Sequence, residues 1–296
     1  MQSVFDELYE NSLAKCEFKN LISIITAEEN IRLAYRNLKK NAGSRTPGTD
    51  GKTIADLAKM SEPELIGFVQ QKFNWYQPQS VRRKEIPKGN GKTRPLGIPT
   101  IMDRLIQQCV LQVMEPICEA KFCETSNGFR PNRGVENALA QAEKHMQKSN
   151  LHIVIDIDIK GFFDNVNHGK LLRQIWAMGI HDKKLLSIIS AMLKAEVAGI
   201  GFPEKGTPQG GILSPLLSNI VLNELDWWIT SQWVGMPTRH EYSGKIHENG
   251  TKDQSKKYRE LRKTNLKECY IVRYADDFKI FCRKHSDAVK LFEATR

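Results

Sequence analysis

Two acidic motifs about 120 positions apart constrain this chain more than any other feature. The first lies in the string IDIDIKGFFD at residues 155–164. The start of this string belongs to a stretch that alternates strictly from residue 152 to residue 159. Such alternation predicts a β-strand with isoleucines on one face and Asp156 and Asp158 on the other. A buried charge is costly unless a partner or a metal compensates it. Two carboxylates on one strand face therefore favour cation binding over a purely structural role.

The second motif is YADD at residues 274–277, between apolar runs at 270–274 and 278–282. These runs predict two strands joined by a tight turn at or near residues 275–277. Adjacent acids are common at turns, so YADD alone is a weak signal. In order with the first motif and with GTPQGG at residues 206–211, it predicts a cage for divalent cations, which suits phosphoryl transfer to a nucleic-acid end.

The charge balance points to polyanionic partners. The chain has 296 residues and a formal net charge of +10, which favours nucleic acid first and an anionic membrane surface second. No apolar run reaches the length of a membrane span, and residues 1–7 do not resemble a secretory signal. The six cysteines lack zinc-site spacing. We therefore expect a cytoplasmic protein with reduced thiols and no membrane partner.

A basic hairpin is predicted at residues 81–99. A Lys/Arg-rich strand, a turn with Asn-Gly at its centre and a returning strand follow one another there. Lys88, Lys92 and Arg94 cluster near the tip, which would suit a triphosphate or a template backbone. A solvated hairpin with no ligand is an equal alternative from these residues alone.

Helices are predicted at residues 26–40, with Thr26 as cap, and at 103–120 and 134–148. A further helix begins after Gly211, with Ser214 as N-cap and Pro215 in the first turn. The loop before it lies at a helix N-terminus, where free N–H groups favour phosphate. An ordinary strand-to-helix turn is the alternative.

Residues 238–267 form a basic segment, with nine Lys and Arg against four Asp and Glu. Tyr242 and Tyr258 are interleaved with these charges. The segment is either an RNA-contacting patch or a flexible surface insertion, and composition does not decide between them.

Taken together, these motifs resemble a reverse transcriptase and, more narrowly, the group II intron-encoded maturase family. The strings that carry the resemblance are YADD at 274–277, DIKGFFD at 158–164, GTPQG at 206–210, IPK with RPLGIP at 86–99, GFRP at 128–131 and GTDG at 48–51. The similarity covers roughly residues 26–296.

The resemblance implies an α+β right-hand polymerase fold of fingers and palm, with an antiparallel palm sheet packed on helices. Residues 1–60 would be an N-terminal extension with a family-specific motif, and residues 61–296 the fingers and palm, with 238–267 as a basic insertion. We expect the thumb or maturase domain and the DNA-binding region to be absent from this chain.

The same resemblance implies a site built on Asp158, Asp276 and Asp277, which would bind two Mg²⁺ ions. Asp158 and Asp276 are expected as the principal ligands, with the Ile159 carbonyl assisting, and Asp277 is expected to point elsewhere and contribute less directly. Asp156 lies on the same strand face, but the KGFF string that follows Asp158 favours Asp158 as the ligand.

Further residues take nucleotide and RNA roles by the same resemblance, with Phe163 as the steric gate against ribonucleotides and Phe162 as the less favoured choice. The nucleotide-binding set is Lys88, Arg94, Lys160, Gly161, Phe162, Phe163, Pro208, Gln209 and Gly210. The RNA-binding set is Arg82, Arg83, Lys84, Lys92, Lys252, Lys256, Lys257, Arg259, Arg262 and Lys263.

The implied function is RNA-directed DNA synthesis by a group II intron protein that also binds its intron RNA to assist splicing and retrohoming. Its partners would be intron RNA, an RNA template with a DNA primer, and dNTPs, and a homodimer stays open. The alternatives are a splicing maturase without polymerase activity, or a reverse transcriptase of a retron, a diversity-generating element or a defence system. A bacterial origin is favoured, and an organellar one stays open.

Overall fold

The computed structural model describes residues 1–296 except 88–90, 92, 243, 247, 249–251 and 296. The chain forms two compact units. Unit 1 comprises Met1–Phe122 and Lys160–Val221, and unit 2 comprises Cys123–Ile159 and Leu222–Arg296. The segment expected as an N-terminal extension, residues 1–60, belongs to unit 1 as a whole.

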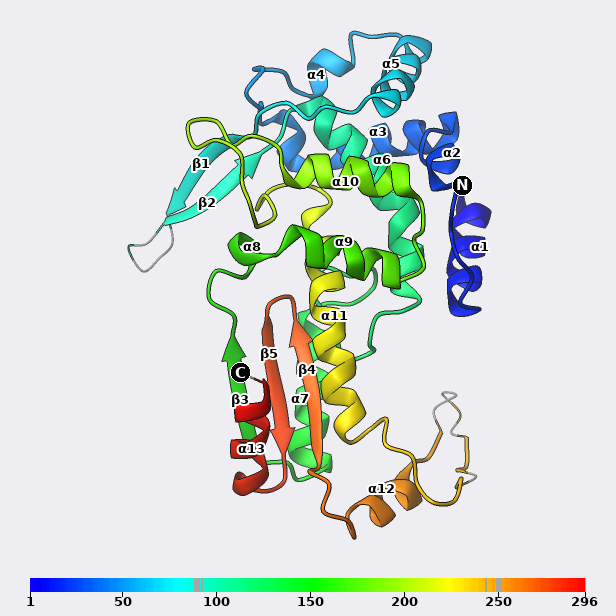
Figure 1. Ribbon diagram of the computed structural model, residues 1–296, viewed down its shortest axis with the longest axis vertical. Helices are drawn as coiled ribbons and strands as arrows, with labels where there is room; N and C mark the ends of the chain where they lie inside the picture. Colours follow the sequence, from blue (N-terminus) through cyan, green and yellow to red (C-terminus); the bar gives the residue numbers. More distant parts are fainter. Residues whose placement is uncertain (88–90, 92, 243, 247, 249–251, 296) are drawn as a thin grey trace. The chain divides into compact units, whose positions relative to one another are not determined.

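Unit 1 is mainly helical, with one two-stranded sheet (Figure 1). Its elements are α1 (Gln2–Leu13), α2 (Leu21–Ile25), α3 (Glu28–Lys40), the 3₁₀ turn η1 (Ala42–Arg45), α4 (Ile54–Leu57), α5 (Glu62–Asn74), β1 (Arg82–Pro87), β2 (Thr93–Ile98), α6 (Ile101–Glu119), α8 (Phe162–Asn165), α9 (His168–Ala177), α10 (Lys183–Leu193) and the first part of α11 (Ser214–Gln232).

Helix α6 is the centre of unit 1, where it packs against α1, α2 and α3. The apolar side chains of one face, from Leu105 to Ile117, are fully buried, so this face belongs to the core. Two buried amides tie α6 to α3. The Asn30 amide donates to the Cys109 carbonyl at 3.1 Å, and the Gln112 amide donates to Asn30 Oδ1 at 2.8 Å. Because each buried amide has a partner, the interior keeps its hydrogen bonds.

The predicted cap of the first periodic helix was wrong. Helix α3 begins at Glu28 with Ala27 as the N-cap residue. Thr26 instead ends α2, where its hydroxyl donates to the Ile22 carbonyl at 2.8 Å. The helix predicted at residues 26–40 is otherwise confirmed as α3, and it begins after Thr26 because the backbone at Ala27 is extended.

The basic hairpin is confirmed. Strands β1 and β2 are antiparallel, with Arg82 opposite Ile98 and Pro87 opposite Thr93. Figure 1 shows the hairpin extending away from the helices of unit 1. Lys88 and Lys92, expected near its tip, lie outside the described residues.

Unit 2 is built around a three-stranded antiparallel sheet in the order β3-β5-β4. Its elements are α7 (Val135–Glu143), the π-helical turn η2 (Lys144–Lys148), β3 (Ile153–Asp158), the later part of α11, α12 (Ser255–Leu261), β4 (Cys269–Tyr274), β5 (Asp277–Cys282) and α13 (His285–Thr295). The helix predicted at 134–148 therefore begins as α7 and continues as a π-helical turn.

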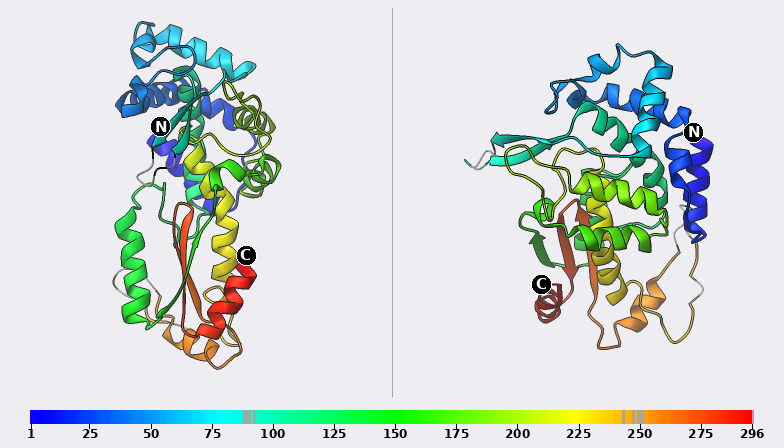
Figure 2. Two further views of the ribbon diagram at one scale, coloured as in Figure 1. Left: turned by 90° about the vertical axis from the view of Figure 1, so that its left-hand side faces the viewer. Right: turned by 45° about the horizontal axis from the view of Figure 1, so that its top comes forward.

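Both faces of this sheet carry helices, and Figure 2 (left view) shows the sheet nearly edge on between them. On one face, Ile155, Ile271 and Ile280 pack with Ile229 of α11 and Leu291 of α13. On the other face, Val272 and Phe281 pack with Leu151 and two alanines of α7. The predicted alternation of β3 is confirmed, since Ile153, Ile155 and Ile157 join the first of these clusters. The second face therefore carries Asp156 and Asp158.

Helix α11 follows the GTPQGG loop, as predicted, but Ser214 does not precede it. Ser214 is its first residue, and the Ser214 hydroxyl donates to the Pro208 carbonyl at 2.8 Å. The Leu213 carbonyl accepts the first helical hydrogen bond, from Leu217 N–H at 3.1 Å. Within the described residues, no helix is both long and apolar enough to cross a bilayer.

We predict that Ile280→Ala destabilises the chain by about 2–5 kcal/mol, because this fully buried side chain of the central strand leaves a cavity when truncated. Val289→Ala on the exposed side of α13 is the control, with an expected change within about 0.5 kcal/mol. Chemical denaturation followed by circular dichroism measures both. Equal stability of the two variants would contradict the assigned core.

Candidate functional site

The acidic motifs of unit 2 meet at one end of its sheet. Asp158, the last residue of β3, lies directly opposite Asp277, the first residue of β5. Two positions along the same pair of strands, Asp156 lies opposite Lys279. Because side chains alternate across a sheet, these four residues share the face opposite to the Ile155 cluster. On that face, the end of the strands at Asp158 and Asp277 carries exposed carboxylates, whereas α7 covers the opposite end.

Lysine 279 compensates part of this negative charge. Its Nζ lies 2.6 Å from Asp156 Oδ1 and 3.5 Å from Asp277 Oδ1. The hydrogen bond to Asp156, together with the charge of Asp277, raises the pKa of Lys279. Asp158 has no ion pair within the described residues. Like charges directly opposite on two strands repel, so a further cation beside Asp158 and Asp277 would stabilise this arrangement.

The hairpin turn places Asp276 differently from its two acidic neighbours. Tyr274 pairs with Asp277, so Ala275 and Asp276 form the two-residue turn. Ala275 has a φ of 57°, a region that residues with a side chain seldom adopt. Asp276 is half-buried, whereas Asp158 and Asp277 are exposed. The register thus brings Asp277 directly across from Asp158, whereas Asp276, expected with Asp158 as a principal metal ligand, lies in the turn.

The carboxylates fit the chemistry of Mg²⁺. Within the described residues, no three His, Cys, Asp or Glu side chains gather closely enough to form a complete metal cluster. Mg²⁺ does not need such a cluster, because it is usually held by one or two carboxylates together with substrate phosphates and water. Asp158 and Asp277 supply hard oxygen ligands on an exposed strand end, so the donor set suits this ion.

A buried ion pair contacts the backbone of the YADD turn. The side chains of Arg273 in β4 and Asp226 in α11 are both fully buried, and Arg273 Nη2 lies 2.6 Å from Asp226 Oδ2. Arg273 Nε donates to Asp226 Oδ1 at 2.8 Å, which makes the pair bidentate. Burial raises the pKa of Asp226 above its ordinary value, and the hydrogen bonds from Arg273 oppose this shift without cancelling it. An ion pair that is fully desolvated needs such complete geometry to be tolerated.

The remaining donors of Arg273 hold the turn itself. Arg273 Nη1 donates to the Ala275 carbonyl at 2.7 Å, and Nη2 donates to Ser126 Oγ at 2.7 Å. The backbone around Ser126 runs beside β4, with the Asn127 N–H donating to the Arg273 carbonyl at 2.9 Å. One guanidinium therefore links a helix, a loop and the acidic turn.

Glycine 128 lets this loop approach the turn. A Cβ at this position would lie 2.2 Å from the Ala275 nitrogen, closer than real contacts allow. Arg130 supports the same loop, since its Nη1 donates to the carbonyls of Cys123 at 2.7 Å and Ser126 at 2.8 Å. The GFRP string at residues 128–131 thus packs against the YADD hairpin.

Sequence reasoning missed Arg273 and Asp226. One signal was available, because a charged residue inside an apolar strand or helix must find a partner. Arg273 interrupts the apolar run at 270–274, and Asp226 interrupts the apolar stripe of α11. The pairing itself could not be read from positions 47 residues apart.

In unit 1, the GTPQG loop is fastened to the segment that follows Asp158. The Thr207 N–H donates to the Phe163 carbonyl at 2.7 Å, and the Gly206 N–H donates to the Val166 carbonyl at 2.7 Å. Gly161 has a φ of 60° and is the N-cap residue of α8, in which Phe162 and Phe163 are buried edge to face. Because both rings are buried to nearly the same degree, burial does not show which of the two would act as the steric gate.

The same loop contacts the basic hairpin. Arg94 Nε donates to Gln209 Oε1 at 2.7 Å, and the Gly97 N–H donates to the Gln209 carbonyl at 3.3 Å. A Cβ at Gly210 would lie 2.4 Å from the Gly97 oxygen, so the loop needs glycine there. The structure thus brings together two predicted nucleotide-binding residues, Arg94 and Gln209. Pro208 lines a cavity of about 300 Å³ beside the loop, and Lys160 is exposed.

The basic segment contains a helix. Tyr258 and Leu261 of α12 pack on the core of unit 2, so the described part of this segment is not merely a loop. Arg262 pairs with Glu268, Lys263 pairs with Glu260, and Lys257 donates to the Val234 carbonyl. The side chains of Lys252, Lys256 and Arg259 are exposed and have no ion pair within the described residues.

The cations of the basic hairpin also differ in whether they have a partner within the protein. Arg83 Nε lies 2.7 Å from Glu85 Oε1, and Lys84 is exposed. Arg82 Nε is buried and has no hydrogen-bond partner within the described part of the chain. Among the predicted RNA contacts in β1, Lys84 is therefore the residue whose charged group is most accessible to a phosphate.

We predict that Arg273→Lys and Asp226→Asn each destabilise the chain by about 3–5 kcal/mol, because either change leaves an uncompensated group in the interior. Chemical denaturation measures the loss, and hydrogen exchange at Ala275 and Asp276 is expected to accelerate. The double variant Arg273→Met with Asp226→Leu is the control and should recover part of the stability. Wild-type stability of both single variants would show that the buried pair does not hold the turn.

Comparisons with known proteins agree with these motifs. The chain matches the family "Reverse transcriptase (RNA-dependent DNA polymerase)" over residues 86–296. Protein YkfC of Escherichia coli (strain K12) is 34% identical, over 88% of this chain and 69% of that protein. Group II intron-encoded protein LtrA of Lactococcus lactis subsp. cremoris is 38% identical, over 77% of this chain and 38% of that protein.

A solved structure, "Partial Cas6-RT-Cas1--Cas2 complex", resembles the chain loosely, with a TM-score of 0.47 and 20% identity over 93% of this chain and 41% of that chain. The family match confirms the expected α+β fold of fingers and palm. The chain spans little more than a third of LtrA. The chain belongs to the reverse transcriptase family and, within it, to the group that includes the group II intron-encoded proteins.

Proposed function

We propose that this chain carries the RNA-directed DNA polymerase activity of a group II intron-encoded protein and also binds intron RNA to assist splicing and retrohoming. The observation that carries the proposal is the pairing of Asp158 with Asp277 at the exposed end of the sheet of unit 2. Two exposed carboxylates at directly opposed positions of neighbouring strands repel each other, and a divalent cation would offset this repulsion in addition to Lys279.

Asp158, Asp276 and Asp277 would hold two Mg²⁺ ions, with the Ile159 carbonyl as a further oxygen ligand. When bound, Mg²⁺ supplies Lewis-acid activation of the primer 3′-hydroxyl and neutralises charge on the leaving pyrophosphate. The protein contributes the placement of these oxygens. Arg273 fixes the turn that carries Asp276, and the β3-β5 register fixes Asp158 against Asp277.

The nucleotide would be held by residues of unit 1. The Arg94 guanidinium suits triphosphate oxygens, and its hydrogen bond to Gln209 orients it. Lys88 takes the same role by family resemblance. Phe163 would exclude a ribose 2′-hydroxyl, and Lys160, Gly161, Phe162, Pro208 and Gly210 would shape the surroundings of the nucleotide.

RNA would contact the exposed cations, namely Lys84 in β1 and Lys252, Lys256 and Arg259 in the basic segment. Lysine and arginine side chains without an internal partner can contact RNA phosphates and displace the counterions condensed on the RNA. The second candidate is a maturase that binds RNA without polymerising. The exposed cations of the basic segment, which have no ion pair within the described residues, support the RNA binding that both candidates share. The presence of all three catalytic carboxylates favours the full activity.

We predict that Asp158→Asn and Asp277→Asn each reduce primer extension on an RNA template by about 100-fold or more. A catalytic metal supplies several kcal/mol of transition-state stabilisation, and each 1.36 kcal/mol is a factor of about ten. Asp276→Asn is expected to cause a loss of the same order. The assay uses Mg²⁺, dNTPs and a pre-annealed DNA primer with the full chain.

Asp156→Asn is the matched control, because it removes a carboxylate from the same strand face, two positions from Asp158. We expect its activity to stay within about threefold of wild type. Product from Asp158→Asn equal to that of wild type would overturn the site. Absence of product from the wild-type chain, with intact RNA binding, would favour the maturase without polymerase activity.

We predict that replacing Lys252, Lys256 and Arg259 by Ala weakens RNA binding and reduces the slope of log K against log salt by about 2–3, since each phosphate contact contributes about 0.7–0.9. The probe is a labelled RNA hairpin in fluorescence anisotropy. Replacing Lys257, Arg262 and Lys263 is the control, and we expect a smaller change because these side chains have protein partners. An unchanged slope in the first variant would rule out phosphate contacts there.

A further inference from the structure

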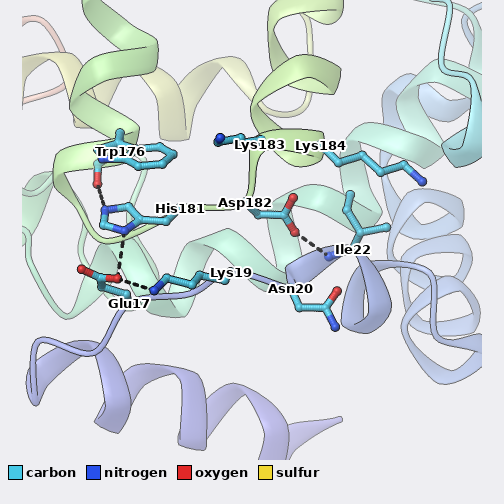
Figure 3. Close-up of a pocket in the computed structure, with 9 residues that line it drawn as sticks. All are labelled: Glu17, Lys19, Asn20, Ile22, Trp176, His181, Asp182, Lys183 and Lys184. Atoms are coloured by element: carbon cyan, nitrogen blue, oxygen red, sulfur yellow. Dashed lines mark hydrogen bonds and ion pairs between the residues drawn. The ribbon is translucent and has the colours of Figure 1, made fainter.

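Unit 1 contains a pocket of about 850 Å³ that none of the preceding assignments uses. Its walls come from the segment between α1 and α2 and from the region where α9 ends and α10 begins (Figure 3). The residues that matter chemically are Trp176, His181, Lys183, Lys184 and Glu17. We call it the Trp176 pocket.

The backbone of the Trp176 pocket is held in place before any ligand binds. The Phe18 N–H donates to the Gly179 carbonyl, and the His181 N–H donates to the Phe18 carbonyl, both at 2.8 Å. Asp182 is buried, and its carboxylate accepts from the N–H groups of Leu21 at 2.8 Å and Leu185 at 3.0 Å. Two segments about 160 positions apart are thereby joined, and a preorganised site loses less entropy on binding.

An indole ring with a fixed plane lines this pocket. Trp176 is 39% exposed, and its ring stacks on His181 with centroids 4.1 Å apart and an interplanar angle of 16°. The imidazole is itself fixed, since its Nε2 lies 3.1 Å from the Trp176 carbonyl and its Nδ1 lies 3.3 Å from Glu17. A planar ligand can extend such a stack.

Lysine side chains line part of the Trp176 pocket. Glu17 is paired with Lys19 at 3.0 Å, and Lys19, followed by His181, lowers the pKa of Glu17. The carboxylate of Asp182 is occupied by backbone N–H groups. Lys183 and Lys184 are exposed and have no acidic partner within the described residues. The pocket therefore offers two uncompensated ammonium groups close in sequence to the stacked ring.

Single exposed aromatic residues are common on protein surfaces and need no ligand. Trp75 is such a residue, since it is 79% exposed and lines neither the Trp176 pocket nor the cavity beside Pro208. Trp176 differs in three respects, namely a cavity, a stacking partner that fixes its plane, and free lysines. An aromatic platform beside cations is the arrangement that binds unpaired nucleotides.

We propose that the Trp176 pocket binds one nucleotide of single-stranded RNA, whose base stacks on Trp176 and whose flanking phosphates contact Lys183 and Lys184. The choice of RNA among polyanions rests on the proposed function. The residues are separate from those assigned to DNA synthesis, so the pocket would hold an unpaired RNA segment while the polymerase residues act elsewhere.

The test is anisotropy titration of the full chain with a labelled single-stranded RNA hexamer, in its natural form and with an abasic site at each position in turn. We expect Trp176→Ala to weaken binding of the natural hexamer about tenfold and Trp176→Phe by less than about threefold, because stacking needs an aromatic face. An abasic site is expected to cost wild type about tenfold and Trp176→Ala almost nothing. Lys183→Ala with Lys184→Ala should reduce the salt slope by about 1.4.

Trp75→Ala and the pair Lys39→Ala with Lys40→Ala are the matched controls, since they remove an exposed indole and two adjacent exposed lysines elsewhere in unit 1. Both should bind as wild type does. Equal abasic losses in wild type and Trp176→Ala, or an unchanged slope in the lysine variant, would overturn the proposal. Equal affinity for a duplex of the same length would also overturn it.

These outcomes do not depend on DNA synthesis, because the titration contains no nucleotides or primer. Failure of the polymerase proposal would appear only in primer extension. If Trp176→Ala fails to fold by circular dichroism, Trp176→Phe and the lysine variant still decide the proposal.

Discussion

The buried pair of Arg273 and Asp226 is the interaction on which the acidic hairpin depends. A guanidinium without access to water must satisfy its donors inside the protein, and here it bonds to Asp226, Ser126 and the Ala275 carbonyl. These bonds hold a turn whose first residue has an unfavourable backbone conformation. Strain of this kind persists only where the surroundings determine the geometry, and a fixed turn gives the carboxylates a fixed position.

The sheet of unit 2 has an apolar face and a face that carries the acidic residues. One face is closed by α11 and α13 through apolar contacts, so it sets the stability of the unit. The other face is closed by α7 only at one end, and the carboxylates lie exposed at the other. Apolar burial thereby supports a cluster of negative charge that would repel itself, and Lys279 offsets part of this repulsion.

Unit 1 achieves a similar result with backbone contacts instead of a buried charge. Glycines at 97, 206 and 210 allow the GTPQG loop to lie against β2 and against the residues after Gly161. The Trp176 pocket is likewise held by hydrogen bonds between segments distant in the chain. Both places join rigid backbone to exposed polar or aromatic side chains, which suits recognition of nucleotides.

Local patterns in the sequence predicted the strands, the basic hairpin, the alternation of β3 and the positions of the three acidic residues, because periodicity and turn chemistry are local. The family motifs added the expected roles. Tertiary packing sets the register of Asp277 against Asp158, the pairing of Arg273 with Asp226, and the place of Trp176 in a pocket with Lys183 and Lys184. Cross-strand register and contacts between remote segments depend on how whole elements pack, and no local pattern encodes them.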